Sequence, residues 1–212
     1  MHYKTQPAAT PSERKFVVMM GLPAAGKSTV ASRRFPTFTR IDCDEVKKTH
    51  ADYDPTNPQA IHAWSQAVVA EMLDGVFSNP TESVIYDSTG TNLERVTSIL
   101  DRAEAAGYNT EVCFVTVPLV ESFRRNSLRP RQVPEQVIRV KAGIIASVAQ
   151  AVKGIQEGKS ASFIAVDNSV WDESLRGAEP PMPVRKSKRG TYEAPGFKGF
   201  KHERTDGWMG GN

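Results

Sequence analysis

A stretch of eight residues near the start of the chain, GLPAAGKS at 21–28, restricts the possible folds more than any other feature. It fits the pattern G-x-x-x-x-G-K-[ST] at every fixed position. In such a loop the glycines let backbone N–H groups curl around a phosphate, and the helix that follows presents its positive end. The lysine neutralises the β- and γ-phosphates, and the serine hydroxyl binds Mg²⁺. The pattern therefore predicts a nucleotide-phosphate-binding loop between a strand and a helix.

The alternative interpretation is a glycine turn followed by an accidental Lys-Ser pair. Ordinary residue frequencies give a chance match in about 1% of chains of this length, so the phosphate-binding interpretation is preferred. The predicted nucleotide-binding residues are Gly21, Leu22, Pro23, Ala24, Ala25, Gly26, Lys27, Ser28 and Thr29.

Short apolar runs alternate with helical periodicity along most of the chain. The run FVVMM at 16–20 is typical of a strand that is buried on both faces. Repeated strand–helix alternation is the pattern of an α/β fold with a mostly parallel sheet. Four further strands are expected at 37–41, 83–86, 111–117 and 162–166, with helices from about 27, at 59–77, 93–106 and 119–127, and at 134–156 with Pro134 in its first turn.

The net charge of +3 arises entirely in residues 177–212, which hold seven Lys/Arg and four Asp/Glu. The rest of the chain is balanced, so the basic pI does not indicate a nucleic-acid platform in the body. Residues 177–212 are rich in Gly and Pro and have no apolar period, which predicts a flexible tail. A solvated tail is the simpler interpretation, and contact of the cluster at 185–189 with nucleic acid or an acidic partner is the alternative.

Composition excludes several classes of protein. No apolar run approaches the roughly 18 residues that a membrane-spanning helix needs. The first 15 residues are polar and lack the apolar segment of a signal peptide. Two cysteines are too few for a disulfide scaffold. We therefore expect a cytoplasmic protein with no membrane partner, made of a loose leader at 1–14, one domain at 15–176 and the tail at 177–212.

Two carboxylates follow the second expected strand, where ligands bind in open α/β sheets. Asp42 and Asp44 lie there, and either could accept the proton of an attacking hydroxyl. Asp44 and Lys47 share a face if a helix starts at Asp44, which would place a base beside a cation able to hold an acceptor phosphate. The alternative is a helix-capping Asp with a surface ion pair, and the nearby phosphate-binding loop favours the functional interpretation.

Asp87 ends the third expected strand, within YDSTGTN at 86–92. A carboxylate there can hold a Mg²⁺-bound water or orient an acceptor. The alternative is that Asp87 is a capping residue and that Thr91 or Asn92 simply caps the next helix.

Four arginines occur within eight residues in RRNSLRPR at 124–131, between two expected helices. Phosphoryl transfer spreads negative charge over the γ-oxygens, and an arginine carried by a mobile segment stabilises that charge. A solvated basic loop is the alternative. We expect at least one catalytic arginine, and the pattern leaves open whether it is Arg125, Arg129 or Arg131.

Taken together, these segments resemble the P-loop kinases of the polynucleotide 5′-hydroxyl kinase and zeta-toxin group, over roughly residues 15–170. The segment that runs from Val117-Pro118 through RRNS at 124–127 to Val133-Pro134 resembles the lid of bacteriophage polynucleotide kinases. IDCDE at 41–45, ADYDP at 51–55 and YDSTG at 86–90 resemble the zeta-toxin side.

This resemblance implies a P-loop NTPase fold with a five-stranded, mainly parallel sheet between helices, and it implies ATP and Mg²⁺ as cofactors. It also implies Asp44 as general base, Lys47 at the acceptor-phosphate position, Asp87 as the essential strand-end carboxylate and Arg129 as the lid arginine.

The sequence is thus interpreted as an ATP-dependent kinase that phosphorylates a hydroxyl, with a nucleic-acid 5′-hydroxyl as preferred acceptor. One alternative acceptor is a nucleotide-like small molecule such as a nucleotide sugar, a nucleoside, or a modified DNA base. An alternative of another class is a nucleotide-binding switch module. The predicted catalytic residues are Asp44, Lys27 and Arg129, and ATP is expected to contact Arg125 and Arg131 as well as the phosphate-binding loop. The predicted substrate-binding residues are Asp42, Lys47, Asp87, Thr89 and Asn92. Ser28 and Asp87 are the predicted metal ligands.

Overall fold

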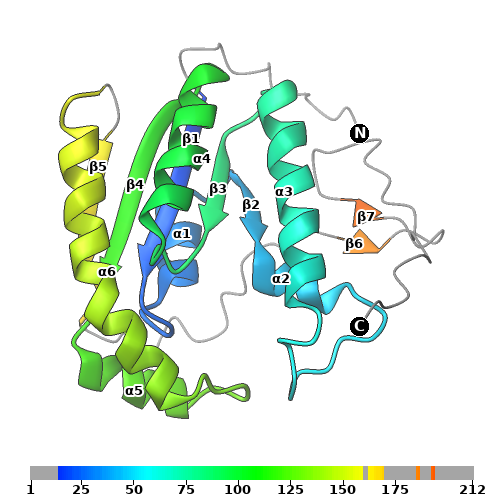
Figure 1. Cartoon of the computed structure of the whole chain (residues 1–212), viewed down its shortest axis with the longest axis vertical. Coiled ribbons are helices and arrows are strands. Elements are labelled where there is room, and N and C mark those ends of the chain that lie inside the picture. Colours follow the sequence, from blue (N-terminus) through cyan, green and yellow to red (C-terminus); the bar gives the residue numbers. More distant parts are fainter. Residues whose placement is uncertain (1–13, 160–161, 170–184, 187–191, 194–212) are drawn as a thin grey trace, which may run out of the picture.

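The chain folds around one sheet of five parallel strands in the order β2-β3-β1-β4-β5 (Figure 1). This computed structural model describes residues 14–159 and 162–169, together with the backbone of 185–186 and 192–193. The strands are β1 Lys15–Gly21, β2 Thr39–Asp42, β3 Val84–Asp87, β4 Asn109–Thr116 and β5 Ser162–Asp167.

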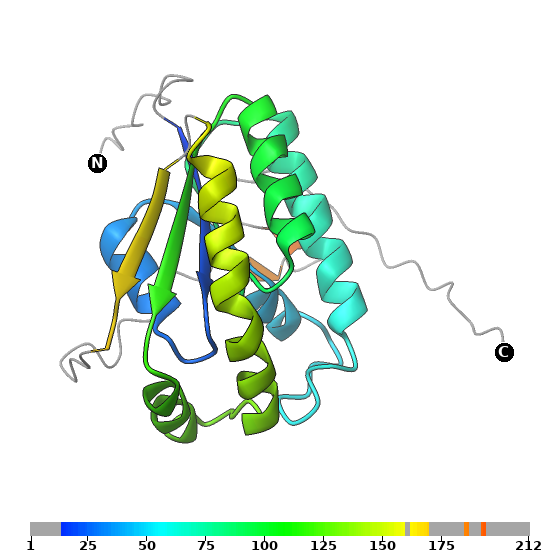
Figure 2. The ribbon, with the colours of Figure 1, turned by 60° about the vertical axis from the view of Figure 1, so that its left-hand side comes forward.

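Helices cover both faces of the sheet, so the domain has three layers (Figures 1 and 2). Helix α1 packs on one face, while α3, α4 and α6 pack side by side on the other. Two further helices, α2 and α5, lie at the end of the sheet where the strands finish. The helix bounds are α1 Lys27–Arg34, α2 Cys43–Lys48, α3 His62–Ser78, α4 Leu93–Ala105, α5 Leu119–Ser127 and α6 Glu135–Gln156.

The central strand β1 shows why a continuous apolar run was required. Side chains alternate across a strand, and both faces of β1 are covered by helices. Phe16, Val18 and Met20 join the apolar cluster under α3, α4 and α6. Val17 and Met19 join the cluster under α1. All five side chains are fully buried, so β1 lies at the centre of the core.

Because all five strands are parallel, their carboxyl ends meet at one edge of the sheet. In Figure 1 the arrowheads point towards the end of the molecule that carries α2 and α5. Strand register places Asp42, the last residue of β2, directly opposite Asp87, the last residue of β3. Gly21, which ends β1, donates its N–H to the Thr89 carbonyl at 3.1 Å. Chain segments that are distant in sequence therefore converge there.

The α/β fold with a parallel five-stranded sheet is confirmed, and each expected helix and strand is present. Some expected boundaries are wrong. The second strand starts at Thr39, not at residue 37, because a turn closed by the Phe38 N–H to Phe35 carbonyl bond occupies 35–38. Helix α3 starts at His62, since hydrogen-bonded turns fill 57–61. Pro134 is the N-cap residue of α6, one position before the first helical turn.

The expected loose leader at 1–14 and flexible tail at 177–212 lie almost wholly outside the described residues. Within the tail, β6 Arg185–Lys186 and β7 Tyr192–Glu193 pair antiparallel, a pairing that the sequence did not predict. In the part of the chain that the structure describes, no helix has both the length and the apolar character needed to cross a membrane.

Candidate active site

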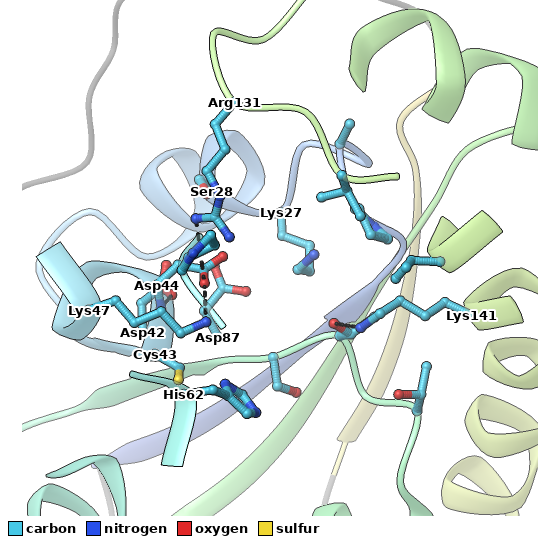
Figure 3. Close-up of a pocket in the computed structure, with 18 of the residues that line it drawn as sticks. Lys27, Ser28, Asp42, Cys43, Asp44, Lys47, His62, Asp87, Arg131 and Lys141 are labelled. Atoms are coloured by element: carbon cyan, nitrogen blue, oxygen red, sulfur yellow. Dashed lines mark hydrogen bonds and ion pairs between the residues drawn. The ribbon is translucent and has the colours of Figure 1, made fainter. Parts of the chain in front are cut away.

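A pocket of about 700 Å³ opens at the carboxyl edge of the sheet (Figure 3). The loop between β1 and α1 forms one wall of this pocket, and the ends of β2 and β3 form its floor. The β2–α3 connection, the segment between α5 and α6, and the first turns of α6 complete it. Every segment that the sequence analysis singled out for chemistry therefore contributes to one cavity.

The β1–α1 loop has the backbone shape that a phosphate-binding loop needs. Gly26 adopts φ 85°, a left-handed conformation that residues with a Cβ rarely take. A Cβ at this position would also collide with Nδ2 of Asn168, which donates to the Ala25 carbonyl at 2.8 Å. Helix α1 has no side-chain cap and no acidic residue in its first turn. Its positive N-terminal end therefore faces the pocket without an internal anion.

Lys27 extends along this loop from the first position of α1. Its Nζ donates to the carbonyls of Gly21 at 3.1 Å and Leu22 at 3.2 Å. Burial lowers the pKa of Lys27 from its ordinary value, and the nearby Asp87 opposes that change. These bonds hold the ammonium against the loop, and Figure 3 shows Lys27 between Asp87 on one side and Lys141 on the other.

Asp42 has two structural partners. Its Oδ1 accepts the N–H of Asp44 at 2.8 Å, which caps α2. Its Oδ2 accepts from Arg40 Nη2 at 2.7 Å. Burial and the neighbouring Asp87 raise the pKa of Asp42 to about 7, although Arg40 acts in the opposite direction. Asp42, which the sequence analysis assigned to substrate binding, therefore caps α2 and pairs with Arg40.

Asp44 faces the pocket with its side chain 57% exposed, and it is paired with a buried lysine. Lys47 Nζ donates to Asp44 Oδ1 at 3.1 Å, the i,i+3 pairing that the sequence predicted. Arg131 approaches the same oxygen at 3.8 Å. Burial opposes ionisation, but Lys47 and Arg131 outweigh it and lower the pKa of Asp44 below its usual value. Asp44 is therefore an ionised carboxylate, as a general base must be.

The segment joining α5 to α6 carries Arg129 and Arg131 over the pocket. Its shape is fixed by Asn126, which is buried and whose side chain bonds both backbone groups of Val133. Nδ2 donates to the carbonyl at 2.8 Å, and Oδ1 accepts the N–H at 2.9 Å. Burial lowers the pKa of Arg129, while Asp44 and Asp87 act to raise it. We call residues 126–133 the lid segment.

Arg125, predicted to bind ATP, does not line the pocket. Its side chain is buried and its Nε donates to Glu121 Oε1 at 2.6 Å. Nη2 donates to the carbonyls of Asn168 at 2.6 Å and Ser169 at 3.3 Å. These contacts tie α5 to the end of β5, just behind the phosphate-binding loop. A sequence pattern that counts arginines does not distinguish one that faces the ligand from one that faces the backbone.

Three basic residues that line the pocket, Arg40, Arg95 and Lys141, were missed by the sequence analysis. Arg40 lies within β2, and its guanidinium contacts Ser28, Asp42 and Asp87. Lys141 projects from α6, and Figure 3 shows it entering from the side opposite Lys47. Its Nζ donates to Thr89 Oγ1 at 3.0 Å. A charged residue inside a short buried strand was the available signal for Arg40, whereas nothing local marks Lys141.

Most of the predicted site residues meet in this pocket. Asn92 both lines it and caps α4 by accepting the Arg95 N–H at 2.8 Å, which is the alternative that the sequence left open. The predicted residues that line the pocket are Pro23, Ala24, Gly26, Lys27, Ser28, Asp42, Asp44, Lys47, Asp87, Thr89, Asn92, Arg129 and Arg131, whereas Gly21, Leu22, Ala25, Thr29 and Arg125 do not.

Charge is strongly unbalanced in the pocket. Seven basic side chains line it against three acidic ones, although the body of the chain as a whole is neutral. Such a concentration of one sign attracts ligands of the opposite sign. The pocket therefore suits a multiply charged anion, and the excess is larger than the phosphate-binding loop alone requires.

Ser28 and Asp87 fit the chemistry of a magnesium site. Both offer hard oxygen donors, and Mg²⁺ is commonly bound by one or two such groups together with substrate phosphates. The place between them suits a cation, because Arg40 Nη2 donates to the oxygens of both side chains. Within the described residues no group of three or more His, Cys, Asp or Glu side chains could hold a metal alone.

Most of the described chain matches the model of one known protein family. Residues 16–153 match the model of a family described as an AAA domain. None of the curated proteins compared with the chain matches it in sequence.

Several solved structures share the fold at low sequence identity. A chain of the AvrRxo1-ORF1:AvrRxo1-ORF2 complex crystallised with sulphate ions superimposes with a TM-score of 0.62 at 16% identity, over 73% of this chain and 54% of that chain. This chain thus spans about half the length of that one. A chain of the PezAT chromosomal toxin-antitoxin system of Streptococcus pneumoniae superimposes with a TM-score of 0.58 at 11% identity, over 84% of this chain and 78% of that chain. A chain from the Pnkp1/Rnl/Hen1 RNA repair complex superimposes with a TM-score of 0.54 at 16% identity, over 70% of this chain and 47% of that chain.

Proposed function

The chain belongs to the AAA domain family matched over residues 16–153, and on that premise we propose that it is an ATP- and Mg²⁺-dependent kinase that phosphorylates a hydroxyl group. The observation that carries this proposal is the Asp44–Lys47 pair. It lies in the same pocket as the phosphate-binding loop and the arginines of the lid segment. A protein that only binds or hydrolyses a nucleotide needs no acceptor base beside a buried cation.

Asp44 is the proposed general base. It accepts the proton of the attacking hydroxyl, whose oxygen bonds to the γ-phosphorus while the bond from that phosphorus to the β,γ-bridging oxygen breaks and ADP leaves. The N–H groups at the start of α1 and the Lys27 ammonium hold the phosphates of ATP. Ser28 and Asp87 would hold Mg²⁺, which when bound shields the phosphate charge.

The lid segment supplies the remaining positive charge. Arg129 and Arg131 both line the pocket, and Arg131 Nη1 also lies 3.8 Å from Asp44 Oδ1. In the transition state, negative charge is spread over the three equatorial oxygens of the transferring phosphoryl group. Arginines in a partly closed pocket stabilise that charge more strongly than they would in water. Arg129 lines the pocket, where burial lowers its pKa, and it is the proposed catalytic arginine.

A nucleic-acid 5′-hydroxyl is the preferred acceptor. The acceptor side of the pocket holds Lys47 and Lys141 on opposite sides, so an acceptor between them meets two cations (Figure 3). A phosphodiester next to the reacting hydroxyl satisfies that charge. The fold shared with a chain of the Pnkp1/Rnl/Hen1 RNA repair complex is consistent with this acceptor.

A nucleotide-like small molecule is the second candidate. Residues 55–59, from the connection between β2 and α3, form part of the pocket wall. Such a wall suits a compact acceptor whose own phosphates reach Lys47 and Lys141. The fold shared with a chain of the PezAT toxin-antitoxin system, over 84% of this chain, does not depend on which of the two acceptors is used.

The test is a transfer assay with γ-labelled ATP and Mg²⁺. The acceptors are a 5′-hydroxyl oligonucleotide, the same oligonucleotide with a 5′-phosphate, and a panel of nucleotide sugars and nucleosides. We expect label at the 5′ end of the hydroxyl oligonucleotide only, and none with Lys27→Ala. Label on a small acceptor alone would replace the preferred acceptor with the second candidate.

A further inference from the structure

Arg40 occupies a position where a charged side chain is unexpected. It lies in the short strand β2, and its side chain is only 6% exposed. Register pairs Arg40 with Ile85 and Asp42 with Asp87. Residues two apart in a strand share a face, so Arg40, Asp42 and Asp87 all point to the α1 side of the sheet, where Ile85 packs. The pleat therefore aims the guanidinium at the first turn of α1.

One nitrogen of this guanidinium contacts three oxygens. Nη2 donates to Ser28 Oγ at 2.8 Å, to Asp42 Oδ2 at 2.7 Å and to Asp87 Oδ2. An arginine Nη carries two hydrogens, so three acceptors share two N–H groups. Nε makes no hydrogen bond within the described part of the chain. Hard oxygens gathered around one positive nitrogen are also the arrangement that a divalent cation requires.

Two of these three oxygens belong to the side chains that the proposed function assigns to Mg²⁺. A guanidinium and a divalent cation cannot hold Ser28 Oγ and Asp87 Oδ2 together, because like charges a few ångström apart repel strongly in a buried site. Resting on the proposed function, we propose that Arg40 is an internal counter-ion that competes with the divalent metal for its donor oxygens. The bare protein then binds free Mg²⁺ weakly, and the metal binds well only when a nucleotide adds its phosphate oxygens.

Arg40 is thus a positioning residue, and its effect is measured as a change in metal affinity and not as a change in turnover. The experiment titrates the full chain with Mn²⁺ and follows free Mn²⁺ by electron paramagnetic resonance, with and without ADP. The variant is Arg40→Met, which keeps an unbranched apolar stem but removes the charge. The matched control is Arg102→Met, which removes the same charge from an exposed arginine. Arg102 lies in the last turn of α4 and pairs with Asp74.

We expect Arg40→Met to bind Mn²⁺ without nucleotide about tenfold or more tightly than the wild type, because a buried like charge has been removed. The gain in Mn²⁺ affinity on adding ADP should shrink correspondingly in this variant. Arg102→Met should behave as the wild type in both titrations. Mn²⁺ affinity that is equal in Arg40→Met and Arg102→Met would overturn the proposal.

Removing Arg40 leaves two buried carboxylates without their cation, which could prevent folding. The comparison is therefore repeated in an Asp42→Asn background, where the double variant Arg40→Met/Asp42→Asn keeps the net charge of the wild type. Tighter Mn²⁺ binding by the double variant than by Asp42→Asn alone supports the proposal, and equal binding overturns it. No acceptor is present, so a failure here is distinct from a failure of phosphoryl transfer.

Discussion

Asp44 is the residue on which the proposed chemistry depends most. We predict that Asp44→Asn lowers kcat by about 10²- to 10⁴-fold, the usual effect of a general base, because the amide cannot accept a proton. Affinity for ATP should stay within about twofold, since the donor is held by the phosphate-binding loop. Single-turnover transfer and ATP titration measure the two quantities. Asp52→Asn is the control, because this 83% exposed carboxylate lies outside the pocket. Near-normal turnover in Asp44→Asn would remove it from the role.

Lys47 sets the protonation of that base. Although burial opposes it, Lys47 contributes most to lowering the pKa of Asp44, so the base form persists below the usual value. Protonation abolishes the base, and turnover is therefore lost only as pH falls through this lowered pKa. Lys47→Met should raise the pKa of Asp44 and move the acid limb of the kcat–pH profile to higher pH. The measurement is kcat from pH 4.5 to 8 at saturating acceptor, and superimposable normalised profiles would contradict the assignment.

The element scale concerns how loops and helices present these residues. The turn from β1 into α1 depends on Gly26, which combines φ 85° with a Cβ position blocked by Asn168. We predict that Gly26→Ala destabilises the protein by about 1–3 kcal/mol and weakens nucleotide binding, because left-handed backbone and the Asn168 contact both resist a side chain. Denaturant unfolding and titration with a fluorescent ATP analogue test the two effects.

Gly143 provides the matched comparison. It lies within α6, and a Cβ there would meet nothing within 4 Å. Gly143→Ala should therefore stabilise the protein by up to about 1 kcal/mol, because alanine has the higher helix propensity. Equal destabilisation by the two substitutions would show that the loss at Gly26 is not specific to the phosphate-binding loop.

Elements differ in how well the sequence predicts them. The β1–α1 loop was predictable because phosphate binding requires a particular residue type at each fixed position, so the pattern is complete in eight consecutive residues. The Asp44–Lys47 pair was also predictable, since it needs only helical spacing. The roles of Arg40 and Lys141 were not predictable. Arg40 extends from β2 to Ser28 in α1, and Lys141 contacts Thr89, which lies 52 positions earlier in the chain. Tertiary packing, which short patterns do not encode, brings those residues into the pocket.

At the scale of the whole molecule, the described residues that line the pocket or form the two apolar clusters all precede residue 177. Pocket residues run from Pro23 to Lys141, and core residues from Phe16 to Val166. We therefore predict that deleting residues 177–212 changes neither the melting temperature nor kcat/KM for a short acceptor. Thermal unfolding and the transfer assay measure these. Loss of transfer in the shortened chain, with folding intact, would mean that the tail contributes to the site.

The fold class was the easiest property to predict. A strand such as β1 with both faces buried leaves an uninterrupted apolar run, which directly marks a parallel sheet. The charge of the pocket was not visible, because its seven basic residues are scattered through a body with zero net charge. Only folding gathers them at one edge of the sheet.

The central claim is that the γ-phosphoryl group of ATP moves to a hydroxyl, and its fate can be followed directly by ³¹P NMR. Wild-type protein is incubated with Mg²⁺, ATP and a 5′-hydroxyl oligonucleotide or nucleotide-like acceptor. The account predicts one new phosphomonoester signal for each ADP formed, and neither product in Lys27→Ala. Formation of ADP with inorganic phosphate alone, across all acceptors, would contradict the account and indicate a nucleotide-binding switch.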